Sequence, residues 1–422
     1  MLARLKYIKN AANTPETKQS LRERLRLTKN EKSQRVAMKR IRAGNDRLFI
    51  LMGPPMELEY YRSRKPGGID ILTKRPGTAR GRKVLEPSYR RLAKKWPKGC
   101  CSQFQHEARL SLSSCCNPHR NPDDGINMVV SLPGENDDQP NWQKLSMTAL
   151  QERTVHFADG GEAQQSSANS HKRDVDSESL CSLLHQALDN GADLRIGLEK
   201  EKLWQLGSEL ATWKIREQSG TPLKDFLPGS PQSWRLRERS ILAVILSHAV
   251  LHCLESPWLC NNWSKEHVVF FRKESSTEFE FDQPFLKVEF QEEDSEPVPF
   301  DPVSIHGNPI ILALGILLLE IYTQTALESR REGQHSSDRE SNANTNLTTA
   351  ITFLKELDGD LRLKYRQAVK ECLYWNDVQL DGDSLRQRIY DRIVEPLERE
   401  LVEGFPDAEN LFHICGQYSK EE

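Results

Sequence analysis

Cysteines and histidines gather in one stretch of this 422-residue chain and could bind a metal ion. Cys100, Cys101 and His106 precede a segment in which apolar and polar residues alternate as in a strand. Zinc needs four ligands that converge tetrahedrally, commonly from cysteines two to four residues apart. Adjacent cysteines on a strand point to opposite faces, so both rarely bind one ion. We therefore expect these side chains to pack or to hydrogen-bond, we keep Cys100, Cys101 and His106 as the metal candidates, and we predict no cofactor.

Two further histidines, His248 and His252, stand four residues apart in an apolar run. In a helix that spacing places them on one face. A zinc-protease motif would add a glutamate and a third ligand, and neither follows here. We expect packed, hydrogen-bonded histidines. The sequence also has no GxSxG motif, no phosphate-binding Walker loop and no GxGxxG motif.

The helices and strands that would position a site have their clearest sequence patterns in the second half of the chain. Apolar residues recur at helical spacing in five segments there, and two strand candidates lie between the first two of them. The helices are predicted at 235–254, 310–322, 347–357, 361–375 and 383–402, and the strands at 267–271 and 284–290.

This order resembles that of the helical lobe of a protein kinase. The stretch SGTPLKDFLPG resembles the chain after the hinge between the lobes, RERSILAVILSHAVLHCL the long central helix, and NNWSKEHVVFF the catalytic loop with its following strand. NPIILALGILLLEIYTQ and LRLKYRQAVKECLYWND resemble two later helices. The resemblance implies an α+β, mostly helical fold: a degenerate protein-kinase-like fold with a reduced N-lobe and a helical C-lobe, preceded by a basic N-terminal helix.

The whole chain also resembles a group of uncharacterised fungal proteins with a C-terminal kinase-like domain. WPKGCCSQFQHEARLSL is similar to their cysteine–cysteine–histidine strand, and ESPWLCNNWSKEHVVFF to a conserved-looking tryptophan block. In that group the domain often stands beside helical domains of the prion-inhibition and HeLo type. The resemblance implies an unidentified protein partner, an upstream helical domain and a role in fungal signalling or self/non-self response.

Alignment with a kinase puts unsuitable residues at the catalytic positions. If HVVF at 267–270 matches the strand after the catalytic loop, Asn262 stands at the catalytic aspartate and His267 at the metal-binding asparagine. Glu289 is the counterpart of the aspartate in the Asp-Phe-Gly turn, and the glycine is missing. An amide cannot accept the substrate proton. We therefore predict a non-catalytic scaffold rather than an enzyme, with an unrecognised nucleotide-dependent enzyme as an alternative.

Trp258 and Trp263 flank the degenerate loop. Indole side chains bury large areas, so both are expected to anchor the loop in a core. The alternative is that they line a pocket for a peptide or another ligand.

The charges are distributed unevenly along the chain. Residues 1–110 contain 28 Lys and Arg against 9 Asp and Glu, whereas the net charge of the whole chain is −2. Such a basic segment could bind nucleic acid or an acidic membrane face, or pair with the acidic remainder. An amphipathic helix within it could also associate with a second copy, as in a coiled coil.

The same features divide the chain into segments and indicate its compartment. No signal peptide is visible, and the longest apolar run, at 310–319, is too short to span a bilayer. We therefore expect an intracellular protein, cytoplasmic or nuclear. The predicted segments are a basic helical segment (1–52), a disordered linker (53–88), a reduced strand-containing lobe (89–228) with a disordered insertion at about 117–179, a helical lobe (229–405) with a disordered insertion at about 329–346, and a tail (406–422).

Overall fold

A computed structural model describes the second of two compact units, Met1–Gly67 and Gly68–Glu422. The described residues are 76–95, 101, 106–115, 125–134, 140–150, 173–175, 180–199, 202–210, 220–227, 234–254, 256–259, 263–272, 279–288, 306–330, 343–357, 359–375 and 382–408. The predicted basic helix at 1–52 therefore lies outside the described residues, as does the predicted tail from residue 409 onward.

Nine described strands form one mixed sheet in the order β4-β6-β5-β3-β2-β1-β9-β8-β7. All neighbours are antiparallel except β3 and β5, which run parallel. A parallel pair needs a crossover connection, and helix α7 (Leu180–Asp189) lies between these two strands in the sequence. The strands are β1 (Ala108–Ser111), β2 (Ile126–Leu132), β3 (Asn141–Ala149), β4 (Arg173–Asp174), β5 (Ala192–Glu199), β6 (Lys202–Leu210), β7 (Thr221–Pro222), β8 (Val268–Phe270) and β9 (Phe285–Val288).

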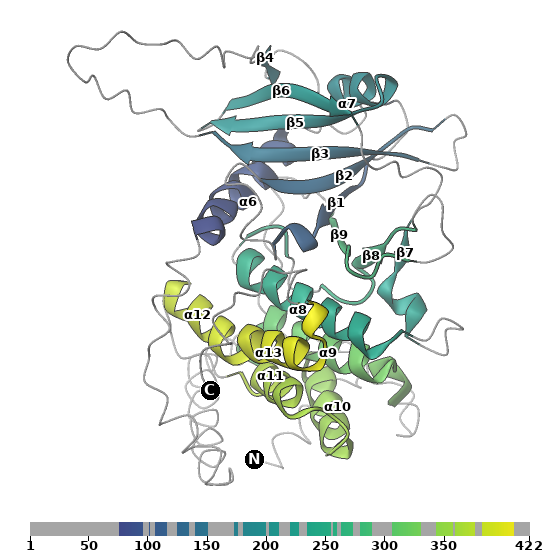
Figure 1. Cartoon of the computed structure of the whole chain (residues 1–422), viewed down its shortest axis with the longest axis vertical. Helices are drawn as coiled ribbons and strands as arrows, with labels where there is room; N and C mark the ends of the chain where they lie inside the picture. Colours follow the sequence, from purple (N-terminus) through teal and green to yellow (C-terminus); the bar gives the residue numbers. More distant parts are fainter. Residues whose placement is uncertain are drawn as a thin grey trace, which may run out of the picture. The chain divides into compact units, whose positions relative to one another are not determined.

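Helices form the rest of the described fold, which is α+β. In Figure 1, strands β1 to β6 lie side by side above, helices α8 to α13 gather below, and β7, β8 and β9 lie between them. The helices besides α7 are α6 (Pro76–Lys95), α8 (Leu236–Cys253), α9 (Pro309–Thr323), α10 (Ala343–Glu356), α11 (Leu363–Leu373), α12 (Gly382–Ile389) and α13 (Glu395–Gly404). None of the helices in the described ranges combines the length and apolar character that crossing a membrane requires.

Helices α8 and α9 are the centre of the helical part. Both are apolar around most of their circumference, and such helices belong in a core. The Asn308 side chain caps α9 by accepting from the backbone N–H groups of Ile310 and Ile311 at 3.0 and 3.1 Å. Pro309 in the first turn costs no hydrogen bond there. The predictions of both helices are confirmed within a few residues.

A buried polar contact joins α8 to α13. His248 Nε2 lies 2.7 Å from Glu398 Oε1, and the Tyr390 hydroxyl donates to the other carboxylate oxygen at 3.2 Å. His248 is thus the packed, hydrogen-bonded histidine that was predicted. Tyr390 begins a π-helical turn that connects α12 to α13. Pro396 follows it, and a proline cannot supply the N–H that an uninterrupted α-helix needs.

The sheet continues from the first half of the described fold into the second because β1 pairs with β9. Its register runs from Ala108 opposite Val288 to Ser111 opposite Phe285. Leu110 on β1 and Leu112 just after it face the main core, as the alternation in the sequence predicted. Arg109, on the opposite face, is also buried, so this junction is covered on both sides.

Two segments predicted to be disordered contain regular structure. Helix α6 begins at Pro76, within the predicted linker at 53–88. Strands β2, β3 and β4 lie within the predicted insertion at 117–179. Polar flanking residues lowered the apolar content of these windows, but β2 is buried along nearly its whole length because tertiary packing covers it. The second insertion, at 329–346, overlaps the end of a short turn at Arg330 and the start of α10 at Ala343.

Candidate functional site

The connection between α8 and β8 is held by two buried indoles. Trp258 and Trp263 are 2% and 1% exposed. Trp258 Nε1 donates to the backbone oxygen of Leu85 in α6 at 2.6 Å, and its ring meets Tyr89 edge-on at 5.4 Å. Trp263 Nε1 donates to the backbone oxygen of Ile310 in α9 at 3.2 Å. Each indole thus anchors the connection to a different helix.

His267 lies at the end of the tight turn that leads into β8. Its Nδ1 accepts a hydrogen bond from the Ser264 backbone N–H at 3.1 Å. Its backbone carbonyl oxygen accepts a hydrogen bond from the N–H of Lys287 in β9 at 2.8 Å. His267 therefore stabilises the turn and its attachment to β9. Asn262 and Glu289, the other two positions aligned with kinase catalytic residues, lie outside the described residues.

Lys265, in the same turn, forms a partly buried ion-pair cluster that sequence reasoning missed. Its Nζ lies 2.5 Å from Glu320 Oε1 and 2.5 Å from Glu328 Oε2. Glu320 is 1% exposed and also accepts from the Leu327 N–H at 2.8 Å. The available signal was a glutamate within the apolar run of α9, because a buried charge needs a partner.

Burial and neighbouring charges shift the pKa values of this cluster in opposite directions. Burial raises the pKa of Glu320, and the attraction to Lys265 only partly offsets it. Burial alone would lower the pKa of Lys265, but the charges and hydrogen bonds of Glu320 and Glu328 outweigh it and raise that pKa. The ammonium group is therefore held in its charged form between the two carboxylates.

Arg109 fills the outer face of the β1–β9 junction. Its guanidinium carbon lies 4.1 Å from the centre of the Trp142 ring and 5.1 Å from that of Phe271, a cation–π arrangement. Val129, Trp142, Phe271 and Phe285 form a separate buried apolar cluster on this face. Burial lowers the pKa of Arg109, whose ion pair with Glu107 spans 3.2 Å.

Gly220 marks how closely the chain approaches this guanidinium. Its φ of +67° is in the left-handed region that favours glycine. A Cβ atom there would lie 2.4 Å from Arg109 Nη1. Within the part of the chain that the structure describes, Arg109 Nε and Nη1 have no hydrogen-bond partner. The junction is therefore closed by packing.

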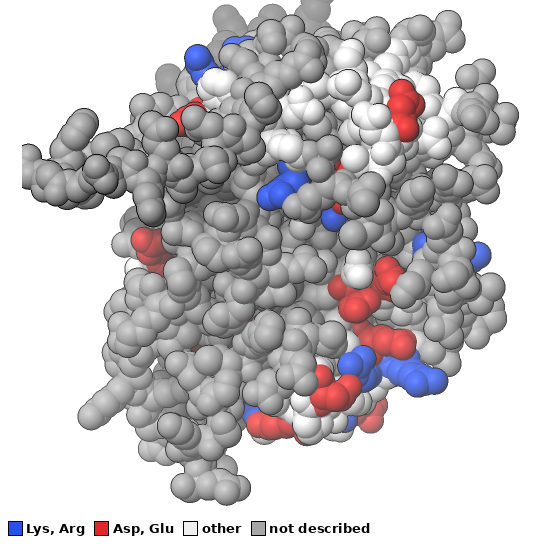
Figure 2. All heavy atoms as spheres, turned by 45° about the horizontal axis from the view of Figure 1, so that its top comes forward, with Lys and Arg blue, Asp and Glu red and all other residues white. Residues whose placement is uncertain are grey.

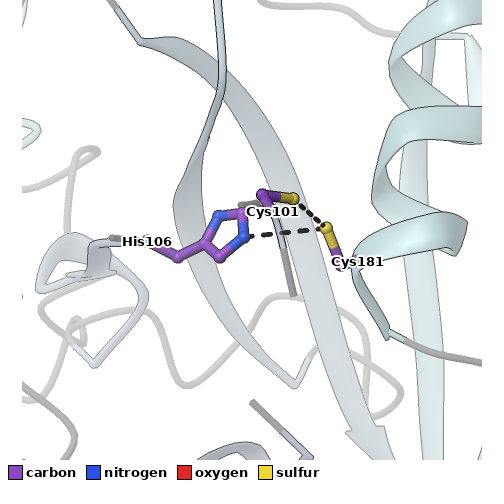
Figure 3. A group of neighbouring side chains, drawn as sticks. All are labelled: Cys101, His106 and Cys181. Carbon is purple, nitrogen blue, oxygen red and sulfur yellow. Dashed lines mark hydrogen bonds between the residues drawn. The ribbon is translucent and has the colours of Figure 1, made fainter. Parts of the chain in front are cut away.

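Part of the predicted cysteine–histidine cluster comes together with residues from α7. Cys101 Sγ lies 3.0 Å from Cys181 Sγ, and His106 Nε2 lies 3.6 Å from the same Cys181 sulfur. Figure 3 shows the Cys101 thiol and the His106 ring pointing toward the Cys181 thiol. His185 Nε2 lies 3.8 Å from Cys101 Sγ. Cys100 lies outside the described residues.

Sequence reasoning found Cys101 and His106 but missed Cys181 and His185. The available signal for Cys181 and His185 was their four-residue spacing in LCSLLHQAL, which places both on one face of the helix. Thiol and imidazole groups are the ligands that zinc prefers. Chemically, this cluster can bind a soft divalent metal, form a disulfide or remain a hydrogen-bonded group.

The hydrogen bonds of His106 define its tautomer. Its Nδ1 lies 2.6 Å from the Ser131 carbonyl oxygen, which can only accept, so Nδ1 carries the proton. In the neutral ring Nε2 then presents a lone pair toward Cys181. Burial lowers the pKa of His106; the Ser131 hydrogen bond opposes this and the charge of His185 adds to it. The neutral form of the ring is thereby favoured.

Strand β3 and helix α7 can be compared with the pattern expected of an active kinase. Kinases pair a lysine of their third strand with a glutamate of the following helix to position phosphates. Helix α7, LCSLLHQALD, contains no glutamate. Lys144 in β3 pairs instead with Asp193 in β5 at 3.0 Å.

Figure 2 displays charged side chains on one face of the molecule. In its lower part, acidic and basic side chains lie next to one another. The mixture is typical of an ordinary solvated surface. Most of the basic segment at 1–110 lies outside the described residues, so the predicted nucleic-acid or membrane association stays a prediction.

Comparison with known proteins identifies the family. Residues 78–404 match the model of the family described as Domain of unknown function (DUF7580). The match spans most of the chain, from α6 to the end of α13, so the chain belongs to this family. No curated protein matches the sequence.

Proposed function

We propose that this member of the DUF7580 family is a non-catalytic, kinase-like interaction module. The observation that carries the proposal is the pairing of β1 with β9. In a working kinase, nucleotide binds between a strand-rich lobe and a helical lobe that move relative to one another. Here a four-residue backbone ladder joins the two parts, and a joint of this kind favours a fixed arrangement over a hinge.

The order of elements supports the kinase-like part of the proposal. Strands with an intervening helix α7 are followed by the buried helix α8, the β8–β9 hairpin and the buried helix α9. This is the order in which the corresponding elements of a kinase occur. Fold analogy alone does not establish function, so the site must carry the functional argument.

The residues at the kinase-like positions support the loss of catalysis. His267, aligned with a metal-binding asparagine, uses Nδ1 within its own turn. Trp142 on β3 and Phe271 after β8 meet edge-on at 5.4 Å, and the Arg109 guanidinium lies against both rings. Side chains therefore fill this face of the β1–β9 junction.

Nucleotide binding provides the first test. The full-length chain is mixed with ATP, with and without magnesium, and its melting temperature and phosphate release are measured. We expect neither to change. Trp142→Ala serves as the matched variant, since it removes one ring of this cluster without altering His267. A magnesium-dependent rise in melting temperature that saturates with ATP in the unmodified chain would overturn the proposal and favour the enzyme alternative.

Partner binding through the surface of the α8–β8 turn provides the second test. Glu266 in this turn is exposed and its carboxylate lies 3.8 Å from Lys224 Nζ, also exposed. Glu266→Arg reverses a surface charge, and Asp383→Arg, on the exposed start of α12, is its control. We expect proteins captured from an extract of the source cell by the wild type to be lost with Glu266→Arg and retained with the control. Equal capture by both variants would exclude this turn as the interaction surface. We further propose that such a partner acts in intracellular fungal signalling, as the sequence resemblance implies.

A further inference from the structure

We propose that Cys101, His106, Cys181 and His185 form a structural zinc site. The three ligand atoms of Cys101, His106 and Cys181 lie within 4.8 Å of one another. His185 lies outside this group of three, but its Nε2 is 3.8 Å from Cys101 Sγ, so a movement of its ring toward the ion would supply the fourth ligand. Two thiolates and two imidazoles are a donor set that selects zinc among the common divalent metals.

The distances between these atoms can be compared with those around a bound zinc ion. With Zn–S near 2.3 Å and Zn–N near 2.0–2.1 Å, a tetrahedral site separates sulfur from nitrogen by about 3.5 Å. Two of the four sulfur-to-nitrogen pairs of such a site, His106 with Cys181 and His185 with Cys101, are 3.6 and 3.8 Å apart here. The sulfurs, at 3.0 Å, must move apart on loading. Two thiolates on one zinc ion lie about 3.8 Å apart, so this movement is about 0.8 Å.

The surroundings of His106 already have the organisation of a metal ligand. A metal-binding histidine usually donates its other ring N–H to a carbonyl or carboxylate, which fixes the ring. His106 donates Nδ1–H to the Ser131 carbonyl, and the adjoining Glu107 N–H donates to Ser131 Oγ at 2.6 Å. His106 Nε2 is thus directed toward the Cys181 sulfur before any metal arrives.

The charge of the centre also balances. On binding, the two thiols lose their protons to solvent, and two thiolates neutralise the divalent ion while both imidazoles stay neutral. Cys181 lies in the first turn of α7, where the helix dipole favours negative charge. Four protein ligands leave no position for substrate, which is the hallmark of a structural site. The ion would tie the segment before β1 to α7, about 80 residues later in the chain.

Metal content and cobalt spectroscopy test the site in the full-length chain. After expression with added zinc and removal of loose metal, we expect one zinc ion per chain by elemental analysis. Replacement by Co²⁺ is expected to give the strong visible absorption of a tetrahedral thiolate-bound cobalt ion. Cys101→Ala and His185→Ala should each lose most of the zinc and this absorption. Cys253→Ala, at a buried free cysteine of α8, should lose neither.

Three outcomes would overturn the proposal. The wild type could contain no zinc and fail to bind Zn²⁺ or Co²⁺ in titration. It could contain a Cys101–Cys181 disulfide, seen as a mass two daltons lower that a reductant restores. Zinc could also be unaffected by Cys101→Ala and His185→Ala, which would place it elsewhere. Because the wild-type titration needs no variant, a variant that fails to fold does not hide the result, and nucleotide binding is independent of all three outcomes.

Discussion

Two regions join the strands to the helices, and they are held by different forces. At the α8–β8 connection, Trp258, Trp263 and Lys265 each direct their polar atoms to specific partners. At the β1–β9 junction, Arg109 and Trp142 are buried with polar nitrogens that have no hydrogen-bond partner among the described residues. The first region is fixed by directional bonds, and the second by a backbone ladder and by packing. Replacing a polar side chain should therefore lower the free energy of unfolding more in the first region than in the second.

The largest effect is expected from Lys265→Met. It leaves Glu320, 1% exposed, without its cation. Removing one partner of a buried ion pair typically costs about 3–5 kcal/mol of unfolding free energy. Chemical denaturation measures the loss. The control is Glu328→Gln, which removes the charge of the partner that is 60% exposed and should cost under about 1 kcal/mol. Equal losses of unfolding free energy in both variants would contradict the view that burial of Glu320 makes its ion pair strong.

The same variant should depend on pH in a defined direction. Without Lys265, burial keeps the pKa of Glu320 above its unfolded value and nothing nearby lowers it as strongly. A raised carboxyl pKa favours the folded state below the unfolded pKa and disfavours it as pH rises through the folded pKa. The stability deficit of Lys265→Met should therefore shrink as the pH falls from neutral toward the ordinary pKa range of a carboxyl group. A Lys265→Met/Glu320→Gln double variant should not show this change.

A smaller contrast is expected between two tryptophans. Trp263→Phe removes the hydrogen bond to the Ile310 carbonyl, whereas Trp142→Phe removes an N–H that has no partner in the described structure. The loss of ring volume is the same in both. We expect Trp263→Phe to be the less stable variant by about 1 kcal/mol in thermal and chemical unfolding. The reverse order would undo the comparison between the two regions.

Arg109→Met should have the smallest effect, although it is the same kind of replacement as Lys265→Met. The cation–π contacts and the ion pair with Glu107 are lost, but so is the desolvation of a buried charge with unsatisfied nitrogens. Glu107, which is 39% exposed, stays hydrated when the guanidinium is removed, so we expect a change within about 1 kcal/mol. A loss as large as that of Lys265→Met would show that the guanidinium holds the junction.

The sequence predicted the elements whose signal is local. Helices α8 and α9 are long apolar runs, and the outward and inward residues of β1 followed from alternation. Strand β3 was missed, and β2 was visible only as a strand-like piece at 128–132 within a segment predicted to be disordered, because polar residues interrupt the signal of both and their burial comes from tertiary contacts.

The candidate sites were only partly predictable for a related reason. Cys101 and His106 were visible as a pair, but nothing local connects them to Cys181, which is 80 and 75 residues away from them, or to His185, which is 84 residues from Cys101. The pairing of Lys265 with Glu320 is likewise separated by 55 residues. Long-range partners of this kind depend on the arrangement of the whole fold, which spacing does not encode.

The position of β1 between β2 and β9 has a consequence for synthesis on the ribosome. Strand β1 is made early, and its second partner, Phe285–Val288, follows only after α8 and β8. Until then one edge of β1 presents unpaired N–H and C=O groups, a template for pairing with other chains. A nascent or truncated chain that stops before residue 285 would therefore be prone to aggregation, and such an intermediate is a natural client for a chaperone.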